Sequence, residues 1–432
     1  MATILVVLAR CMLLLTLIAA PWAIGGADLP EQQWLFAGTL AAGVLAWLGV
    51  VSGGTARFSP AASAILLLVA ALIAIGAAQL APHPHYPEFR NAPLTGPLHV
   101  LDGDDTPATA RSLYPAATRL QMGRLAIALC AFLGGAWLFR ERNARYGLWA
   151  LLALNGIAVV AFGLVQRSSW NGQLYWSIPL ELGGQPFAAF VNRNNAAEYL
   201  SLCLAGALGL WASRRARPAS ASSSNRASPP PRSAIGVWER VPATTWSIMF
   251  LFLFGGVLAT LSRGGALSAV AAVLLVGVWS AAGGRVRTLL LPLLGIVIAA
   301  GIWISVSQQG GALRDRLGSL GRTAASDGRL NHWNDMRGAI RDFPRLGTGL
   351  GTYRYANRPY ENRRSESWFE SADNQYLELI ADGGLGAGAV ALLLLAAGAG
   401  LAIAWRRADC PGEAMACGYA LIAIGLQSVT DC

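Results

Sequence analysis

The sequence contains no lysine, and charged residues of any kind are scarce in it. Only 13% of the 432 residues are charged, whereas 54% are hydrophobic and the mean hydropathy is +0.46. A soluble domain carries about 25% charged residues, because its surface faces water. The composition therefore argues against a soluble enzyme and a disordered chain. It predicts an all-α fold, a polytopic transmembrane helical bundle.

Paired cysteines are lacking as well. The six cysteines lie in or beside apolar segments at irregular spacing, which predicts neither a disulfide framework nor a zinc site. All 33 basic residues are arginine, the net charge is +10 and the pI is about 9.8. In a membrane chain this charge indicates topology and anionic lipid or phosphate ligands, and we expect no nucleic-acid partner.

Eleven apolar runs are long enough to cross a bilayer, which takes roughly 17–25 helical residues. We expect spans near 2–20, 34–52, 61–80, 121–139, 146–165, 187–212, 244–262, 264–282, 288–306, 386–404 and 415–430. The last run is short and the sequence stops at Cys432 without a polar tail, so we expect the natural chain to continue and to hold about 11–12 spans.

Arginines in the short loops predict the orientation of these spans. With the N-terminus in the cytoplasm, every inner connection is basic, including a Ser/Pro/Arg-rich tract over 213–240 that we expect to be disordered. Two long loops then face outward, and the second of them carries eleven arginines. The expected organisation is N-terminal helices over 1–186 with an outer loop over 81–120, core helices over 187–306, a large periplasmic loop over 307–385, and C-terminal helices over 386–432.

Two arginines are expected within the membrane or close to its outer surface. Arg193 lies in the Asn-Arg-Asn-Asn motif at 192–195, and Arg263 lies in the Leu-Ser-Arg-Gly-Gly connection at 261–265. An arginine at this depth is costly and tends to face a cavity, which favours a functional role. The structural alternative is that each side chain only reaches out to the interface.

Within the large loop, apolar residues at helical spacing predict an amphipathic helix over 329–343 that lies on the bilayer or on the bundle. Pro344 ends this helix, and the glycines of the following RLGTGLGTY segment predict a flexible turn. Further on, Ser371 is a good N-cap and Gly383 a good residue to follow a helix C-terminus. Asp373 then falls in the first helical turn, as a capping or a functional carboxylate.

These motifs, taken in order, resemble the O-antigen ligase and polymerase superfamily of bacterial envelope glycosyltransferases. The resemblance extends from about Asn192 to Asp431. It is carried by the following motifs: Arg193 with its asparagines, Ser262-Arg263-Gly264, Gly328-Arg329, Trp333, Pro344, the glycines at 347, 349 and 351, Ala372-Asp373-Asn374-Gln375-Tyr376-Leu377, and Gly383-Gly384-Leu385-Gly386.

The resemblance implies an inner-membrane enzyme that takes a glycan from undecaprenyl diphosphate on the periplasmic face. The acceptor is the lipid A core in ligases, a second lipid-linked glycan in polymerases and a protein in pilin-type transferases. Such enzymes need no metal ion and no cofactor. The implied partners are therefore the donor, one of these acceptors and membrane lipids.

The resemblance also implies roles for single residues. Arginine binds phosphate oxygens as a two-pronged fork and stays charged, so we expect Arg193, Arg263 and, as a weaker third, Arg329 to bind the diphosphate. Asp373 stands where the family has a histidine, and we expect it to be the general base. His332 is the alternative base, or simply a residue of the amphipathic helix.

Two other functions remain open. A transporter or flippase would also place arginines in a helical bundle, although transporters often show internal repeats and this sequence shows no matching halves. A catalytically inactive family member would bind lipid-linked glycan without transferring it, and the aspartate at position 373 keeps this alternative open.

Overall fold

The computed structural model describes residues 2–26, 29–52, 58–82, 110–180, 186–215, 237–281, 328–361 and 371–429. The predicted span near 288–306 lies outside this part of the chain. So do most of the 81–120 loop, most of the 213–240 tract and residues 307–327 of the large loop.

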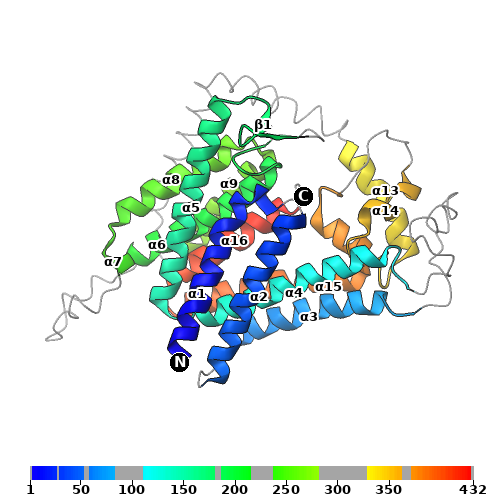
Figure 1. Cartoon of the computed structure of the whole chain (residues 1–432), viewed down its shortest axis with the longest axis horizontal. Coiled ribbons are helices and arrows are strands. Elements are labelled where there is room, and N and C mark those ends of the chain that lie inside the picture. Colours follow the sequence, from blue (N-terminus) through cyan, green and yellow to red (C-terminus); the bar gives the residue numbers. More distant parts are fainter. Residues whose placement is uncertain are drawn as a thin grey trace. The chain divides into compact units, whose positions relative to one another are not determined.

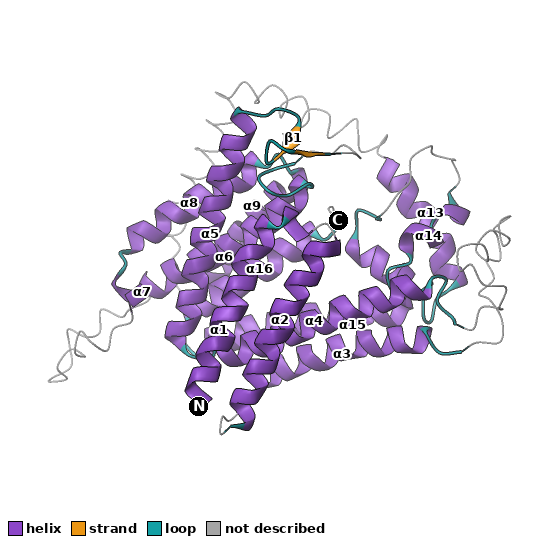
Figure 2. Cartoon of the chain, in the orientation of Figure 1, coloured by secondary structure: helices purple, strands orange, loops and turns teal. Residues whose placement is uncertain are grey.

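Helices form most of the described chain, which confirms the predicted all-α membrane fold (Figures 1 and 2). Eight of them are long and apolar enough to cross a membrane. These are α1 (Ala2–Ala19), α2 (Leu29–Val51), α3 (Pro60–Gln79), α4 (Pro115–Leu138), α5 (Arg142–Ser168), α6 (Arg193–Arg215), α9 (Arg263–Ala281) and α15 (Gln375–Arg407).

The remaining elements are shorter. Two predicted spans, 244–262 and 415–430, correspond to helices of 17 residues each, α8 (Ala243–Ala259) and α16 (Pro411–Gln427). The others are α7 (Val237–Arg240), α13 (Gly328–Asp342), α14 (Tyr353–Ala356), the 3-10 helices η1 (Ala20–Trp22), η2 (Ile24–Gly26) and η6 (Arg358–Tyr360), and an antiparallel hairpin of β1 (Gln173–Leu174) and β2 (Ile178–Pro179).

The chain divides into two units, each built from separate stretches of sequence. Unit 1 comprises 1–61, 131–307 and 398–427, and unit 2 comprises 62–130, 308–397 and 428–432. The predicted domain boundaries stay a prediction.

Unit 1 is organised around α6, the most buried of the long helices. It packs against α5, α8, α9 and α16. Glycines at these crossings leave no room for a side chain: a Cβ at Gly156 of α5 would lie 2.7 Å from the Cβ of Cys203, and one at Gly209 would lie 2.9 Å from that of Ala416. Small residues let membrane helices approach closely and gain van der Waals contact, which stabilises this bundle.

Unit 2 is held together by the glycine-rich turn that follows α13. Its backbone pairs with the first part of α15, since Thr348 and Gly349 donate their N–H groups to the carbonyls of Ala381 and Asp382 at 2.9 and 3.0 Å. Gln79, at the end of α3, donates to the Asp382 carbonyl at 2.7 Å and accepts the N–H of Leu350 at 2.9 Å. The prediction of a flexible turn is therefore wrong, because the turn is buried and fully bonded.

The glycines of this turn are needed for its shape. Gly347, Gly349 and Gly351 all have positive φ, at 68°, 121° and 77°. A side chain at Gly347 would also collide with the backbone of Asp382. Glycine residues are equally typical of a flexible segment and of a fixed turn with positive φ, so the sequence alone does not distinguish the two.

Gly347→Ala should therefore lower the stability of unit 2. A positive φ alone costs a non-glycine residue about 1–3 kcal/mol, and the clash with Asp382 adds to it. Gly123→Ala is the matched control, since Gly123 lies in α4 with no atom within 4 Å of its virtual Cβ. The apparent Tm of the purified chain in detergent should fall for Gly347→Ala and stay within a few degrees for Gly123→Ala. Equal Tm values would contradict the packed turn.

The predicted amphipathic helix is confirmed as α13, and its apolar side faces protein. Met336 and Ala339 are fully buried, and they form a small core with Tyr353, Ala372 and Ala381. The helix was predicted to lie either on the bilayer or on the helical bundle, and α13 packs on the protein.

The predicted N-cap of α15 is wrong. Asn374, not Ser371, is the N-cap, and its Oδ1 accepts the N–H groups of Tyr376 and Leu377 at 3.1 Å each. Asp373 precedes the helix with φ +50°, so it is not in the first turn. The predicted helix end at Gly383 is confirmed to within one residue, because Gly384 (φ 73°, ψ −176°) is non-helical and separates this first part of α15 from a second part that runs to Arg407. Asparagine caps as well as serine does, which made the two choices equivalent from sequence.

Candidate functional site

Arg193 and Arg263 each begin a helix of unit 1. Arg193 is the first residue of α6, and Asn192 caps that helix by accepting the N–H of Asn194 at 2.8 Å. Arg263 is the first residue of α9, where Ser262 accepts the N–H of Gly265 at 3.0 Å. Each arginine therefore stands at the positive end of a helix dipole, where anions are favoured.

The first turns of these two helices are in contact. A Cβ at Gly265 would lie 2.5 Å from the Cβ of Ala197, and both residues are buried. Gln427, at the end of α16, donates to the carbonyl of Asn194 at 2.8 Å and fixes the start of α6. The structure thus brings together the helix turns that carry the two arginines, whose side chains are half-buried.

Asp373 lies in unit 2, on a short segment that is held from two sides. The carbonyl of Ala372 accepts the indole N–H of Trp333 at 2.8 Å, and the N–H of Ala372 donates to Glu378 at 3.1 Å. Ser371 donates its hydroxyl to Asp373 Oδ1 at 3.4 Å. The Asp373 side chain is half-buried, and its backbone has a positive φ that few non-glycine residues adopt. Such strain clusters at functional sites.

His332 is a buried partner of this segment. Its Nε2 is hydrogen-bonded to the Tyr353 hydroxyl, and its Nδ1 faces the Asn357 amide at 3.4 Å. Burial lowers the pKa of His332, although the charges of Glu361, Asp335 and Asp373 oppose this effect. The imidazole is therefore neutral at pH 7. Only 5% of His332 is exposed, whereas Asp373 is half-buried.

The network continues away from Asp373. Asn357 donates to Glu361 at 3.0 Å, and Arg358 forms an ion pair with Glu361 at 2.8 Å. Tyr353, Asn357 and Glu378 belong to this arrangement although no sequence motif predicted them. The burial of His332 could have been predicted from helical spacing, because it lies one turn before Met336 on the buried side of α13.

The third predicted arginine, Arg329, lies in α13 of unit 2, and its side chain is outside the described residues.

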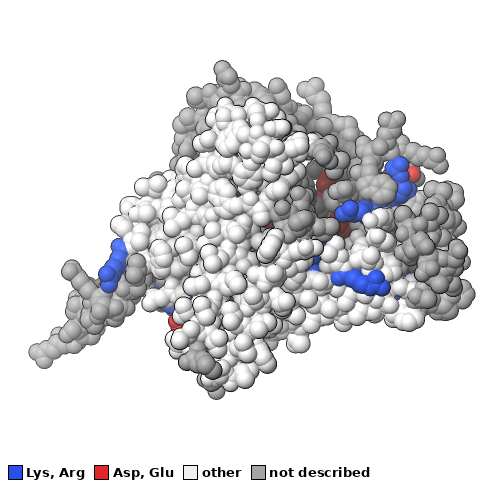
Figure 3. All heavy atoms as spheres, in the orientation of Figure 1, with Lys and Arg blue, Asp and Glu red and all other residues white. Residues whose placement is uncertain are grey.

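On the face shown in Figure 3, arginine side chains gather over α13, α14 and α4, with acidic side chains beside them. Among the described residues, no group of three His, Cys, Asp or Glu side chains could hold a metal ion.

Comparison with known families identifies the segment that contains Asp373. Residues 248–392 match the model of a family described as O-antigen ligase. This segment is an O-antigen ligase family domain. The resemblance inferred from the motifs is thereby confirmed, and glycosyl transfer by a multi-pass membrane protein is the activity that the family indicates.

The O-antigen ligase match includes Arg263, Arg329, His332 and Asp373, whereas Arg193 precedes it. No curated protein matches the chain.

Proposed function

We propose that this chain is a membrane glycosyltransferase of the O-antigen ligase type. It transfers a glycan from undecaprenyl diphosphate to an acceptor on the periplasmic face of the bacterial inner membrane, without a metal ion. The contact between the arginine-headed first turns of α6 and α9 carries this proposal, because it assembles phosphate-binding chemistry in a chain with an O-antigen ligase domain.

In unit 1, Arg193 and Arg263 bind the diphosphate of the donor. When the bond between the anomeric carbon and the diphosphate oxygen breaks, negative charge develops on the leaving undecaprenyl diphosphate. Guanidinium groups and helix N-termini stabilise that charge, and such electrostatic stabilisation is often the largest contribution to catalysis.

In unit 2, Asp373 accepts the proton of the acceptor hydroxyl as that oxygen attacks the anomeric carbon. The strained, doubly anchored backbone of Ala372 and Asp373 holds the carboxylate in one orientation. A positioned general base is worth about 10²–10⁴-fold in rate. The lowered pKa of the nearby His332 favours its neutral form, so it adds no positive charge that would make the Asp373 carboxylate a weaker base.

The acceptor is a lipid A core, a second lipid-linked glycan or a protein. Purified chain in vesicles separates the proposal from its rivals when it is given undecaprenyl-diphosphate-linked glycan and acceptor. The transferase forms product and releases undecaprenyl diphosphate, a flippase moves the donor without product, and an inactive family member only binds it.

The proposed orientation places a set of arginine–aromatic pairs of unit 1 at the cytoplasmic interface. Five arginines lie over aromatic rings there, and all five are at helix ends predicted to be cytoplasmic. The pairs are Arg140 with Trp137, Arg142 with Tyr146, Arg145 with Trp405, Arg215 with Trp211 and Arg406 with Trp279. Aromatic and basic side chains anchor helices at the membrane interface.

Cysteine labelling tests this orientation. In a chain whose native cysteines are replaced, a cysteine at Arg358, in the large loop, should react with a membrane-impermeant maleimide added to intact spheroplasts. A cysteine at Arg215, at the end of α6, is the matched control and should react only after permeabilisation. The opposite pattern would refute the proposed topology and, with it, a periplasmic reaction.

A further inference from the structure

Helix α14 lies against the beginning of α4 within unit 2. A Cβ at Gly351 would lie 3.4 Å from the Cβ of Gln121, and the rings of Tyr355 and Tyr114 meet edge-on with centroids 4.8 Å apart. These contacts flank Arg354 in the sequence, so Arg354 is presented beside the first turns of α4.

Arg354 is exposed on a rigid support. Its neighbours Thr352, Tyr353 and Ala356 are fully or almost fully buried, and the N–H of Gly351 donates to the Asp382 carboxylate at 2.7 Å. Within the described part of the chain, Arg354 forms no ion pair, whereas Arg358, one turn later, is neutralised by Glu361.

A second arginine, Arg124 of α4, lies near Arg354. Arg124 Nη1 lies 3.4 Å from Oε1 of Gln121, the residue packed against Gly351, so the guanidinium of Arg124 turns toward α14. The positive charges of Arg124 and Arg354 act on one another, and Glu378 offsets part of the charge of Arg354. Like charges brought together cost free energy that a bound anion would recover.

The position of Arg124 in the chain indicates what kind of anion this is. Arg124 lies inside α4, an apolar helix long enough to cross the membrane, less than three turns from its first residue. An arginine this close to the end of a membrane-spanning helix lies near the level of the lipid headgroups, so it can bind ligands that have a charged head and a hydrocarbon tail.

We propose that Arg124 and Arg354 form a binding site for the phosphate or diphosphate headgroup of a lipid. Two guanidinium forks from different elements grip phosphate oxygens, and the apolar surface of α4 leads away from them for the lipid chain. The anion site stands on the geometry of unit 2 alone.

Binding of inorganic pyrophosphate to the full chain in detergent tests the site. The titration is done in an Arg193→Ala/Arg263→Ala background, which removes the anion-binding residues proposed in unit 1. Pyrophosphate should still bind there, and adding Arg354→Ala or Arg124→Ala should weaken it about tenfold or more, the usual effect of losing a charge-assisted hydrogen bond. Arg354→Lys should restore part of the affinity, which separates charge from misfolding.

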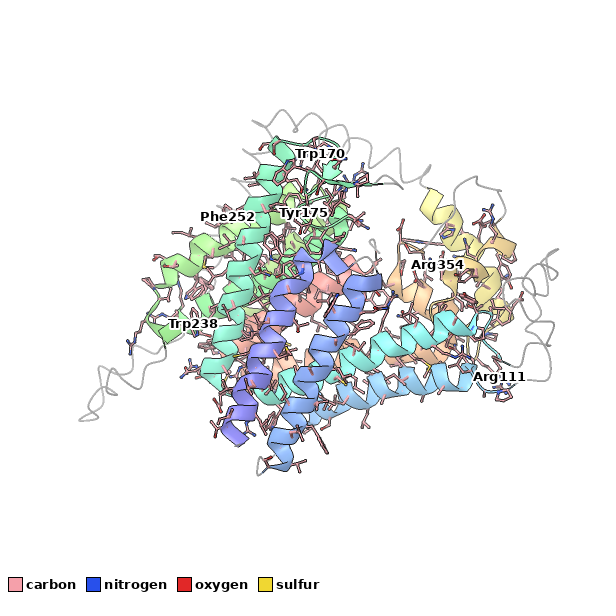
Figure 4. All side chains as sticks on the ribbon, viewed as in Figure 1. Arg111, Trp170, Tyr175, Trp238, Phe252 and Arg354 are labelled. Carbon is pink, nitrogen blue, oxygen red and sulfur yellow. The ribbon has the colours of Figure 1, made fainter. Side chains whose placement is uncertain are left out.

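Arg111→Ala is the matched control. Arg111 is also exposed in unit 2, and Figure 4 shows it apart from Arg354, so its loss should leave binding unchanged. Absence of pyrophosphate binding in the background, or equal affinity of all variants, would overturn the anion site.

Two further probes identify the lipid. Farnesyl diphosphate should bind more tightly than pyrophosphate, and Arg354→Ala should weaken it, if the site takes an isoprenoid-linked diphosphate. If phosphatidylglycerol nanodiscs instead displace pyrophosphate and farnesyl diphosphate gains nothing, the occupant is a phospholipid headgroup. If neither lipid depends on Arg354, the lipid assignment is wrong. A chain that binds these probes but transfers no glycan would refute the proposed function alone.

Discussion

Replacement of Arg193 or Arg263 by alanine should abolish glycan transfer while the protein stays in the membrane. Each arginine begins a helix of unit 1, and the first turns of α6 and α9 touch through Gly265 and Ala197. Removing either one leaves the diphosphate with one guanidinium fork instead of two. It leaves the helix caps intact, because Asn192 and Ser262 supply them.

Lysine should rescue these variants only in part, because a point charge replaces a fork that binds two oxygens at once. Arg406→Ala is the matched control. Arg406 also belongs to unit 1, but its guanidinium lies over Trp279 and donates to the Trp279 carbonyl at 2.6 Å, far along α9 from Arg263. Transfer rate at matched expression is the measurement. Near-normal rates for both alanine variants would place diphosphate binding elsewhere.

The second large effect is expected at Asp373. Asp373→Asn should lower turnover by roughly 10²–10⁴-fold, the usual contribution of general acid–base catalysis. Donor binding should survive, because the arginines of unit 1 bind the diphosphate. The structure sharpens this experiment: Asn374 is the N-cap of α15, so loss of the Asp373 charge does not uncap the helix. Asparagine also tolerates the positive φ at this position.

Asp373→His should retain some activity, with a pH profile that follows imidazole titration near pH ~6.5. Activity of this variant should fall as the pH drops through that value, because a protonated imidazole cannot accept the acceptor's proton. His332→Gln is the companion variant. It removes the buried imidazole that bonds Tyr353, and a far larger loss there than in Asp373→Asn would make His332 the base.

The helices could be read from the sequence, whereas the environment of Asp373 could not. Apolar runs of sufficient length predict spans directly, and α13 shows its buried side in the spacing of Met336 and Ala339. The segment around Asp373 depends on partners far along the chain, such as Trp333 and Glu378. No local pattern encodes those contacts, and Ser371 and Asn374 are equally good caps.

The glycine turn illustrates the same limit. A glycine-rich segment is compatible with mobility and with a fixed turn that needs positive φ. Whether such a segment is mobile or fixed depends on its partners. Here Gln79 of α3 and the carbonyls of Ala381 and Asp382 in α15 form hydrogen bonds with the turn and fix it. Contacts at that sequence separation appear only in the folded chain.

One measurement tests the central claim most directly: product formation by purified chain in vesicles supplied with undecaprenyl-diphosphate-linked glycan and a candidate acceptor. The wild-type chain should release one undecaprenyl diphosphate for each glycan transferred, with EDTA present. Arg263→Ala and Asp373→Asn, incorporated at the same density, should release almost none. Donor translocation or binding without product from any of the three acceptor classes would contradict the account.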